Sequence, residues 1–386
     1  MNGDVGAARI GISGAGFVGS GLRKCLKRRA DMVLTRMLSR RRPADDDGLF
    51  CDSIDELVDH ADLIVECTGD IDHACNVVEA AFAAGLPVVT MNAEFQVTAG
   101  SYYVGKGRIT EGRGDQPGSL AALAEEVRAM GFSALVYGSQ KGFLNLTPDL
   151  ETMRYWADRQ GIGLSRVVSF TDGTKLQIEH ALVANGLGAT IAQPELLGQK
   201  NDDLRAGAFE LAEEALRLGE AISDYVLQPG GSGEVFIVAN HEDDHADVLR
   251  YLKMGEGPNY LFVRPYHLCH FELISTIERC LAGGSVLLDN GAEPRIGVAA
   301  VAKRTLKRGE VLGEGIGSFD VRGIAVPIAA FPDHVPIGLF RNCKILNEIA
   351  PGQLIERADV AISDGPSSRA WEDIRSRVVR SAALSS

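Results

Sequence analysis

The sequence has 386 residues, of which 45% are hydrophobic and 24% are charged, as in an ordinary globular protein. This length exceeds one domain and suits two or three. The net charge of −13 argues against nucleic acid and membrane partners, because phosphate groups attract basic surfaces. We expect a cytoplasmic protein with free thiols, since we find no leader pattern, no membrane-length apolar run and seven dispersed cysteines.

The most informative stretch is residues 9–22, where an apolar run breaks into Gly14-x-Gly16-x-x-Gly19 and resumes with helical spacing. In a strand-turn-helix unit, Gly14 permits the tight turn, Gly16 lets a pyrophosphate approach the backbone, and Gly19 lets the helix lie close to the strand. An ordinary strand-to-helix turn is the simpler alternative. The context predicts a dinucleotide site at the positive end of the helix, formed by Gly14, Gly16, Phe17, Val18 and Gly19.

The second predicted strand, residues 32–38, indicates which dinucleotide binds. It ends in Ser39-Arg40-Arg41-Arg42, where an NAD site usually carries an acid for the ribose 2′-hydroxyl. A hydroxyl followed by arginines suits a 2′-phosphate, because guanidinium groups form bidentate bonds to phosphate oxygens. We predict NADP (NADPH), held by Ser39, Arg40 and Arg41, over a solvated basic turn.

Two further strands are expected at residues 61–69 and 86–92, with a crossover helix at 72–85 between them. In an open parallel sheet, ligands bind beyond the carboxyl ends of the strands. Polar residues at these two ends therefore point to the same crevice as the glycine turn. They are Thr68, Gly69, Asn92 and Glu94.

The pattern along the chain predicts an α/β fold with an N-terminal Rossmann parallel sheet, a central α+β substrate domain and a small C-terminal β-rich domain. The expected boundaries are 1–146, 147–291, 292–363 and a tail at 364–386. The first domain ends with a helix at 117–131 and a strand at 132–138, and Thr147-Pro148 predicts the start of the next helix. In the central domain we expect strands at 166–171, 234–239 and 260–264, and helices at 174–188, 208–224 and 268–282.

Residues 170–181 form the densest polar cluster at a helix start. The spacing places Lys175 and Glu179 on one face, one turn apart. A surface ion pair would be the simpler interpretation. We favour a lysine that faces the crevice, where its ammonium donates to a substrate carbonyl or phosphate while Asp172 or Glu179 orients it.

This helix, with its pattern Asp172-x-x-Lys175-Leu176-x-Ile178-x-x-Ala181, resembles the substrate-binding helix of homoserine dehydrogenases. The segments Thr68-Gly69, 88–92 and 114–118 also resemble loops of that group. The resemblance implies a nicotinamide-dependent oxidoreductase that acts on a small molecule and forms a homo-oligomer. Homoserine dehydrogenases carry a lysine directly after the fifth-strand asparagine, whereas this sequence has Ala93, so Lys141 is the expected substitute.

Two C-terminal segments, 298–312 and 345–355, each read as an apolar strand followed by a tight turn. Both resemble the repeated elements of SAF (antifreeze-like) domains, a similarity that covers about residues 296–363. The tail at 367–384 has helical spacing and alternating charge. It is either a docking helix or a frayed end.

These observations favour an NADP-dependent reductase of a small polar aldehyde or ketose, with or without a phosphate group. Lys175 and Lys141 would act on the substrate, and Asp172, Glu179 and Asp115 would orient them or relay protons. One alternative is an enzyme similar to 1-deoxy-D-xylulose-5-phosphate reductoisomerase, with Mg²⁺ or Mn²⁺ held by Glu94, Asp115 and Glu179. Another is a non-catalytic NADP-binding sensor or scaffold.

Overall fold

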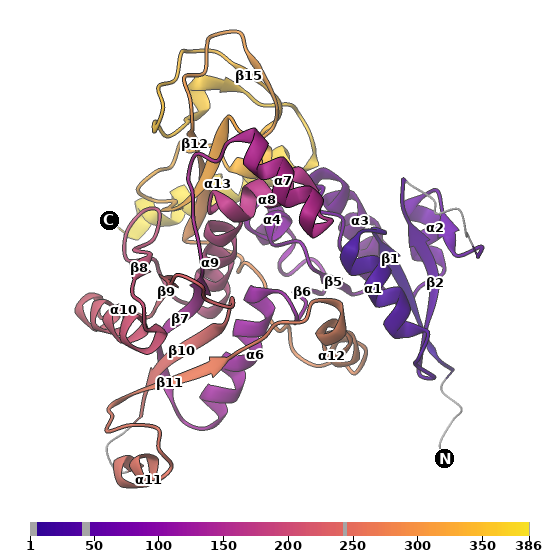
Figure 1. The fold of residues 1–386 in the computed structure, drawn as a ribbon. Helices are drawn as coiled ribbons and strands as arrows, with labels where there is room; N and C mark the ends of the chain where they lie inside the picture. Colours follow the sequence, from indigo (N-terminus) through magenta and orange to yellow (C-terminus); the bar gives the residue numbers. More distant parts are fainter. Residues whose placement is uncertain (1–5, 41–46, 242–244, 386) are drawn as a thin grey trace.

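The computed structural model describes residues 6–385 except 41–46 and 242–244, with side chains described to residue 381. An N-terminal parallel sheet, a central mixed sheet and small C-terminal antiparallel sheets follow one another along the chain (Figure 1). The predicted fold class is therefore confirmed. All seven cysteines are free thiols, as the sequence predicts. Among the described residues, no helix has the length and apolar character needed to cross a bilayer.

The N-terminal sheet has six parallel strands in the order β3-β2-β1-β4-β5-β6. Its core strands are apolar on both faces, because helices cover both sides of such a sheet. The strands are β1 (Ala8–Ser13), β2 (Met32–Leu38), β3 (Phe50–Cys51), β4 (Leu63–Glu66), β5 (Val88–Thr90) and β6 (Ile109–Glu111). The helices between them are α1 (Phe17–Leu26), α2 (Ile54–Asp59) and α3 (Ile71–Ala83), and short helical turns α4 (Ala93–Phe95), η1 (Gln96–Gly100) and α5 (Ser101–Tyr103) follow β5.

The central sheet has the order β11-β10-β7-β9-β8 and is mixed in direction. Its strands are β7 (Ser133–Lys141), β8 (Gln199–Lys200), β9 (Ile222–Leu227), β10 (Val235–Asn240) and β11 (Asn259–Arg264). The helices around it are α6 (Gln116–Ala129), α9 (Thr174–Leu187), α10 (Leu204–Leu218) and α11 (Ala246–Tyr251). The strand expected at 132–138 in the first domain is β7, which pairs within this second sheet.

Three local predictions in this region are wrong. The expected strand at 166–171 belongs to helix α8 (Leu164–Thr171), whose apolar residues pack against helix α7 (Leu150–Gln160). The expected helix at 208–224 ends at Leu218, and β9 follows after a turn at Gly219. Helix α7 begins after Asp149, whose carboxylate accepts a hydrogen bond from the Thr152 amide, and not at Thr147-Pro148.

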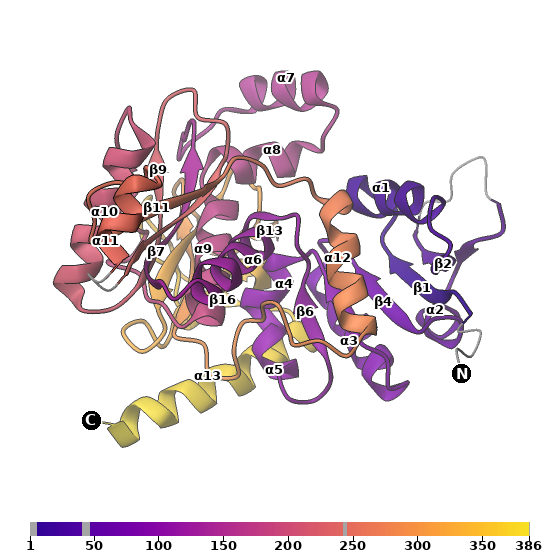
Figure 2. The same ribbon diagram turned by 90° about the horizontal axis from the view of Figure 1, so that it is seen from below.

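Helix α12 (His270–Leu281) returns from the central region to the N-terminal sheet. It packs along α1 and stands beside that sheet in Figure 2. Leu273 and Ile277 are fully buried in the same apolar cluster as Ile10 and Ile12 of β1. The N-terminal and central regions therefore share a core on this side.

The C-terminal region contains two small antiparallel sheets, β12-β14 and β13-β15-β16. Their strands are β12 (Ile296–Ala302), β13 (Val311–Glu314), β14 (Val321–Pro327), β15 (Arg341–Ile345) and β16 (Val360–Ala361), with 3-10 turns η3 (Ile337–Leu339) and η4 (Arg357–Asp359). β14 lies against α9, where the Gly323 amide donates to Thr174 Oγ1 and the Ala325 amide donates to Gln177 Oε1. The polar residues of α9 therefore fix the C-terminal region onto this helix.

The C-terminal tail is a docked helix, α13 (Pro366–Ser385), and not a frayed end. It packs against α3 and η1 and lies along the lower edge of the view in Figure 2. Its first turn is anchored because Asp72 Oδ1 accepts hydrogen bonds from the amide and the hydroxyl of Ser367. Trp371 and Ile374 are buried in the core that α9 and the C-terminal strands share.

We predict that Trp371→Ala lowers the free energy of unfolding by about 3–5 kcal/mol, because it leaves a cavity under α13. Chemical denaturation followed by circular dichroism would measure the change. Val379→Ala on the same helix is the control, since Val379 is 36% exposed and should cost far less. Equal denaturation curves for Trp371→Ala and the wild type would contradict a docked α13.

Candidate active site

The glycine turn has the geometry that the motif requires. Gly14 has a φ of +112°, which side chains rarely allow, so the tight turn depends on glycine. A Cβ on Gly19 would lie 1.9 Å from the carbonyl oxygen of Gly14, so only glycine lets α1 come this close to β1. A Cβ on Gly16 would meet no atom within 4 Å. The backbone at the N-terminus of α1 is therefore open to a ligand such as a pyrophosphate.

A pocket of about 680 Å³ opens beside this turn. All three regions of the chain line it. From the N-terminal region come Phe17, Val18, Arg40, Thr68, Gly69 and Glu94; from the central region come Asp115, Arg166, Phe170, Lys175 and Cys269; from the C-terminal region come Glu314, Phe340, Arg341 and Asn342. A pocket of this size holds a cofactor or a metabolite.

The predicted cofactor residues occupy different positions around the pocket. Phe17, Val18, Thr68, Gly69 and Arg40 line the pocket, and Gly14, Gly16 and Gly19 form the turn beneath it. Ser39 directly follows β2, whereas Arg41 and Arg42 lie outside the described residues. Asn92 is fully buried, and its side-chain oxygen caps α4 by accepting a hydrogen bond from the Phe95 amide.

Lys175 lies among three carboxylates. Its Nζ is 3.3 Å from Glu94, 3.4 Å from Asp115 and 3.7 Å from Glu179. The carboxylates come from three different elements: Glu94 from α4, Asp115 from the N-cap of α6, and Glu179 from the next turn of α9. The side chain of Lys175 is 12% exposed and lines the pocket, so Lys175 and Glu179 belong to a largely buried cluster and do not form the surface ion pair that was the simpler interpretation.

This cluster shifts the pKa values of its members. Burial opposes the charge on Lys175, but the surrounding carboxylates, Asp115 first, outweigh it and hold the pKa of the ammonium well above its usual range. Burial, followed by repulsion from Asp115, raises the pKa of Glu179 to about 8. At neutral pH, Lys175 therefore carries its charge while the Glu179 carboxyl largely keeps its proton.

Lys141 lies at the end of β7, close enough for its charge to interact with Glu179 and Asp172. Burial lowers the pKa of its ammonium, and the two carboxylates partly oppose this shift. Lys141 and Lys175 therefore share Glu179 as an electrostatic partner, although the pocket wall contains only Lys175 of the two.

The structure places Asp172 differently from the prediction. Its carboxylate bonds to Lys303 of the C-terminal region at 2.5 Å and accepts the Thr174 amide, and both charged side chains are almost fully buried. It does not orient Lys175, because the Lys303 ammonium already satisfies it. Breaking such a buried pair costs more than a surface pair, so Asp172 holds the start of α9 to β12.

Two buried acids were missed by the sequence analysis. Glu66 ends β4, and its carboxylate accepts hydrogen bonds from the amide and hydroxyl of Thr68. Glu111 ends β6, and neither of its carboxyl oxygens has a partner in the described structure. Burial, with repulsion from Asp115, raises the pKa of Glu111 well above its usual range. Glu66 and Glu111 could have been found from the sequence, because each ends a predicted or observed strand of the parallel sheet.

Two arginines in the pocket wall were also missed. Arg166 was assigned to a strand, but it lies in α8, where Ser165, Arg166 and Ser169 follow helical spacing and line the pocket together. Arg341 of β15 also lines the pocket and pairs with Asp70 at 3.0 Å. No sequence signal connects Arg341 to the N-terminal sheet.

The metal-dependent alternative needs oxygen ligands from Glu94, Asp115 and Glu179. Within the part of the chain that the structure describes, no three His, Cys, Asp or Glu side chains are arranged to hold a metal ion. Glu94, Asp115 and Glu179 surround the Lys175 ammonium, which takes the place that a cation would need.

A doubly wound parallel sheet with a glycine turn between its first strand and first helix is an arrangement that binds dinucleotides. Two family models match the chain in the same order. Residues 14–101 match the NAD-binding domain of homoserine dehydrogenase, and residues 114–273 match the catalytic domain of oxidoreductase DRL. These matches support the oxidoreductase and homoserine dehydrogenase-like part of the recognition made from the sequence, and neither model extends into the C-terminal region that resembles SAF domains.

No curated protein sequence matches this chain. Solved structures of similar arrangement include UDP-N-acetylglucosamine 3-dehydrogenase from Acidithiobacillus ferrooxidans, at 12% identity over 74% of this chain and 92% of that chain, with a TM-score of 0.40. Homoserine dehydrogenase from S. aureus matches at 13% identity over 72% and 76%, with a TM-score of 0.39. Dihydrodipicolinate reductase from Paenisporosarcina sp. TG-14 matches at 10% identity over 72% and 94%, with a TM-score of 0.35.

We predict that Glu179→Gln changes how stability depends on pH. The folded pKa of about 8 exceeds the ordinary value of 4.5, so the stability that this carboxyl contributes is present at low pH and is lost as the pH rises through about 8. Thermal unfolding midpoints of Glu179→Gln should therefore rise relative to the wild type between about pH 5 and about pH 9.

Glu213→Gln is the matched control, because Glu213 is an exposed residue of α10. Its difference from the wild type should stay constant over the same pH range. A constant difference for Glu179→Gln as well would show that Glu179 is an ordinary carboxylate.

Proposed function

We propose that this protein is an NADP-dependent oxidoreductase that reduces the carbonyl group of a small polar aldehyde or ketose. One observation carries the proposal: the Lys175 ammonium lines the same pocket as the glycine turn. A cation at that place can polarise a substrate carbonyl in a pocket that a dinucleotide shares. A sensor without chemistry would have little use for a buried ammonium there.

The glycine turn fits a dinucleotide because α1 presents unobstructed backbone amides at Gly16. Phe17 is 62% exposed and lines the pocket, and Thr68 and Gly69 line the same space from the end of β4. The nicotinamide of the cofactor supplies the hydride of the reaction. The N-terminal region thus holds the cofactor, and α8 and α9 of the central region face it.

Lys175 stabilises the negative charge that develops on the substrate oxygen when a carbonyl is reduced. Glu94 and Asp115 hold the ammonium from two other elements, so it does not swing away when the substrate leaves. Such preorganisation matters because a donor that is already oriented costs no reorganisation during the reaction.

The reduction also consumes one proton. Lys175 can give that proton to the substrate oxygen, and the largely protonated Glu179 carboxyl, 3.7 Å away, can return it. Lys141 lies beyond Glu179 and modulates the charge of this carboxyl, so its role in the proposal is to support the relay.

The arginines of the pocket favour a substrate with an anionic group. Arg166 lines the pocket from α8, and no residue in the described ranges forms an ion pair with it. A guanidinium in this state binds a carboxylate or a phosphate. A phosphorylated or carboxylated substrate would thus place its carbonyl near Lys175 and its anion near Arg166.

The choice of NADP rests on the end of β2. Arg40 lines the pocket, and its side chain is 88% exposed, so it is accessible to a 2′-phosphate. No acid follows β2 at the place where NAD enzymes usually carry one. The SAF-like character of residues 292–363 and assembly into a homo-oligomer are further parts of the proposal, implied by the resemblance.

We predict that Lys175→Met lowers turnover at least about 100-fold, because it removes the cation that stabilises the developing charge. Turnover would be followed as NADPH consumption with a panel of small aldehydes and ketoses, using the best substrate of the wild type. NADPH binding, measured by fluorescence, should persist in this variant. Lys200→Met, at an exposed residue of β8, should behave as the wild type; full activity of Lys175→Met would refute the assignment.

We predict that Arg40→Ala weakens NADPH binding by about tenfold, while NADH binding stays unchanged, because only NADPH carries the 2′-phosphate. Fluorescence titration of both cofactors measures the ratio, and Arg28→Ala at an exposed position of the turn after α1 provides the control. The combined replacement of Arg40, Arg41 and Arg42 should abolish the preference. A wild type that binds NADH more tightly than NADPH would overturn the cofactor assignment.

A further inference from the structure

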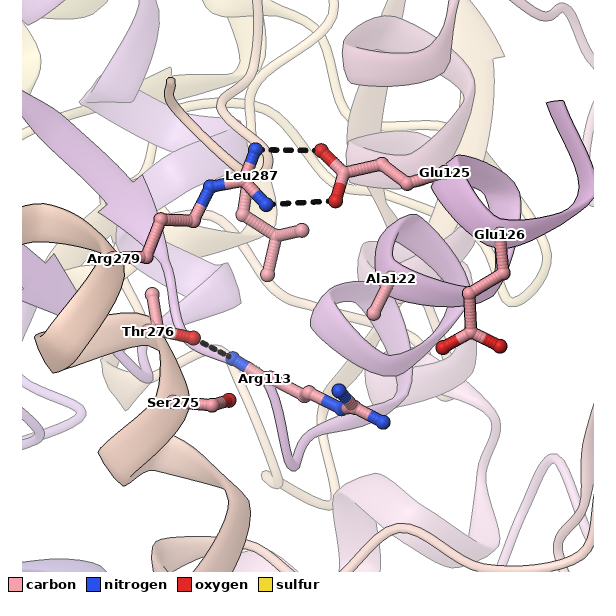
Figure 3. Close-up of a pocket in the computed structure, with 8 residues that line it drawn as sticks. All are labelled: Arg113, Ala122, Glu125, Glu126, Ser275, Thr276, Arg279 and Leu287. Carbon is pink, nitrogen blue, oxygen red and sulfur yellow. Dashed lines mark hydrogen bonds and ion pairs between the residues drawn. The ribbon is translucent and has the colours of Figure 1, made fainter. Parts of the chain in front are cut away.

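A second, smaller pocket of about 270 Å³ lies between α6 and α12. Figure 3 shows the eight residues that line it: Arg113, Ala122, Glu125, Glu126, Ser275, Thr276, Arg279 and Leu287. Arg113 belongs to this pocket, whereas Asp115, two residues further on, belongs to the pocket of Lys175. The same short segment therefore contributes to both pockets.

One wall of this pocket is fixed by satisfied bonds. Arg279 forms two hydrogen bonds to the Glu125 carboxylate, at 2.7 and 2.6 Å, and its Nε donates to the Ser285 carbonyl at 2.7 Å (Figure 3). These groups have no free bonding capacity directed at a ligand. They hold α6 and α12 apart at a constant distance.

The other wall carries Arg113 and Glu126, whose charged groups have no ion-pair partner among the described residues. The Arg113 Nε is buried without a hydrogen-bond partner, and its guanidinium points from the loop toward α6 (Figure 3). Within the described ranges, neither Arg113 nor the exposed Glu126 takes part in an ion pair. A buried guanidinium donor without a partner is costly, so this side chain is suited to receive an acceptor from outside the chain.

We propose that this pocket binds a small α-amino acid, whose carboxylate pairs with Arg113 and whose ammonium group pairs with Glu126. A guanidinium prefers the two oxygens of a carboxylate, and a carboxylate at the rim accepts an ammonium. Ala122 and Leu287 offer an apolar surface for a short side chain. The volume lies below the usual range for larger ligands, which excludes a nucleotide.

Binding there would be felt at Lys175 through the segment 112–115. The Arg113 amide donates to Thr276 Oγ1 at 2.9 Å, and the Gly114 carbonyl accepts the Cys269 amide at 2.8 Å. A Cβ on Gly114 would lie 2.1 Å from the Cys269 carbonyl oxygen, so the segment is packed closely against the residue that precedes α12. A ligand that displaces Arg113 therefore displaces Asp115 and its contact to Lys175. An effect of the displaced contact on turnover rests on the proposed function, whereas binding of the amino acid does not.

The test is calorimetric titration of the intact chain, without cofactor, with three probes: L-alanine, L-alaninamide and propionate. We expect L-alanine to bind, propionate to bind more weakly, and L-alaninamide not to bind because it lacks the carboxylate. Arg113→Met should weaken L-alanine and propionate binding by at least about tenfold, and Arg113→Lys should weaken them less. Glu126→Gln should weaken L-alanine binding and leave propionate binding unchanged.

Arg154→Met, at an exposed position of α7, is the matched control and should bind all probes as the wild type does. Lys175→Met should also retain binding, which separates this pocket from the active site. The proposal is overturned if L-alanine produces no heat of binding at millimolar concentration, if Arg113→Met binds it normally, or if Lys175→Met loses it. Because no outcome depends on turnover, a failure of the proposed function would leave this result readable.

Discussion

The ammonium of Lys175, held among Glu94, Asp115 and Glu179, is the interaction on which the architecture of the site depends. Each carboxylate belongs to a different element, so the cluster joins the end of the N-terminal sheet, the start of α6 and the core of α9. A charge at 12% exposure is tolerated only when it is paired. The cluster thus fixes the relative position of the cofactor half and the substrate half of the pocket.

The C-terminal region is part of this arrangement and not an appendage. The buried Lys303–Asp172 pair and the bonds from β14 to Thr174 and Gln177 hold α9 from behind. On the pocket side, Arg341 reaches Asp70 at the start of α3. The C-terminal strands therefore both support the helix that carries Lys175 and complete the wall in front of it.

Local patterns made much of the fold predictable. Apolar spacing, turns and caps depend on neighbours in sequence, and they were enough to predict several elements. These are the glycine turn, β2 with its exact bounds, α3, α9 and α12. The prediction of a strand at 166–171 was wrong. Val167 and Val168 favour strands, but in the structure they pack against α7 as part of a helix. The sequence analysis did not predict that β7 pairs in the second sheet, because strands that pair there lie far apart in the sequence.

In the site, too, local pairs could be predicted and long-range pairs could not. Lys175 and Glu179 could be paired from helical spacing, but Glu94 lies 81 residues from Lys175 and could be placed only through the sheet topology. Asp172 was misassigned because its partner, Lys303, lies 131 residues away in a region whose packing on α9 no motif revealed. Residues that pair across such separations are determined by tertiary structure, which a single sequence does not display.

The excess of acids around Lys175 has a chemical consequence. One ammonium faces Glu94, Asp115, Glu179 and, electrostatically, Glu111, so the cluster cannot be neutral if every carboxyl is ionised. Burial makes ionisation of the innermost groups costly and raises the pKa values of Glu179 and Glu111, and protonation of these carboxyls lowers the excess of negative charge. The site therefore stores protons directly beside a fixed cation. Hydride addition to a carbonyl needs both at once, because the new alkoxide must be stabilised as it forms and protonated before it leaves. Under the proposed function, the surplus of carboxyl groups, which is unfavourable for folding, would supply protons for the reduction.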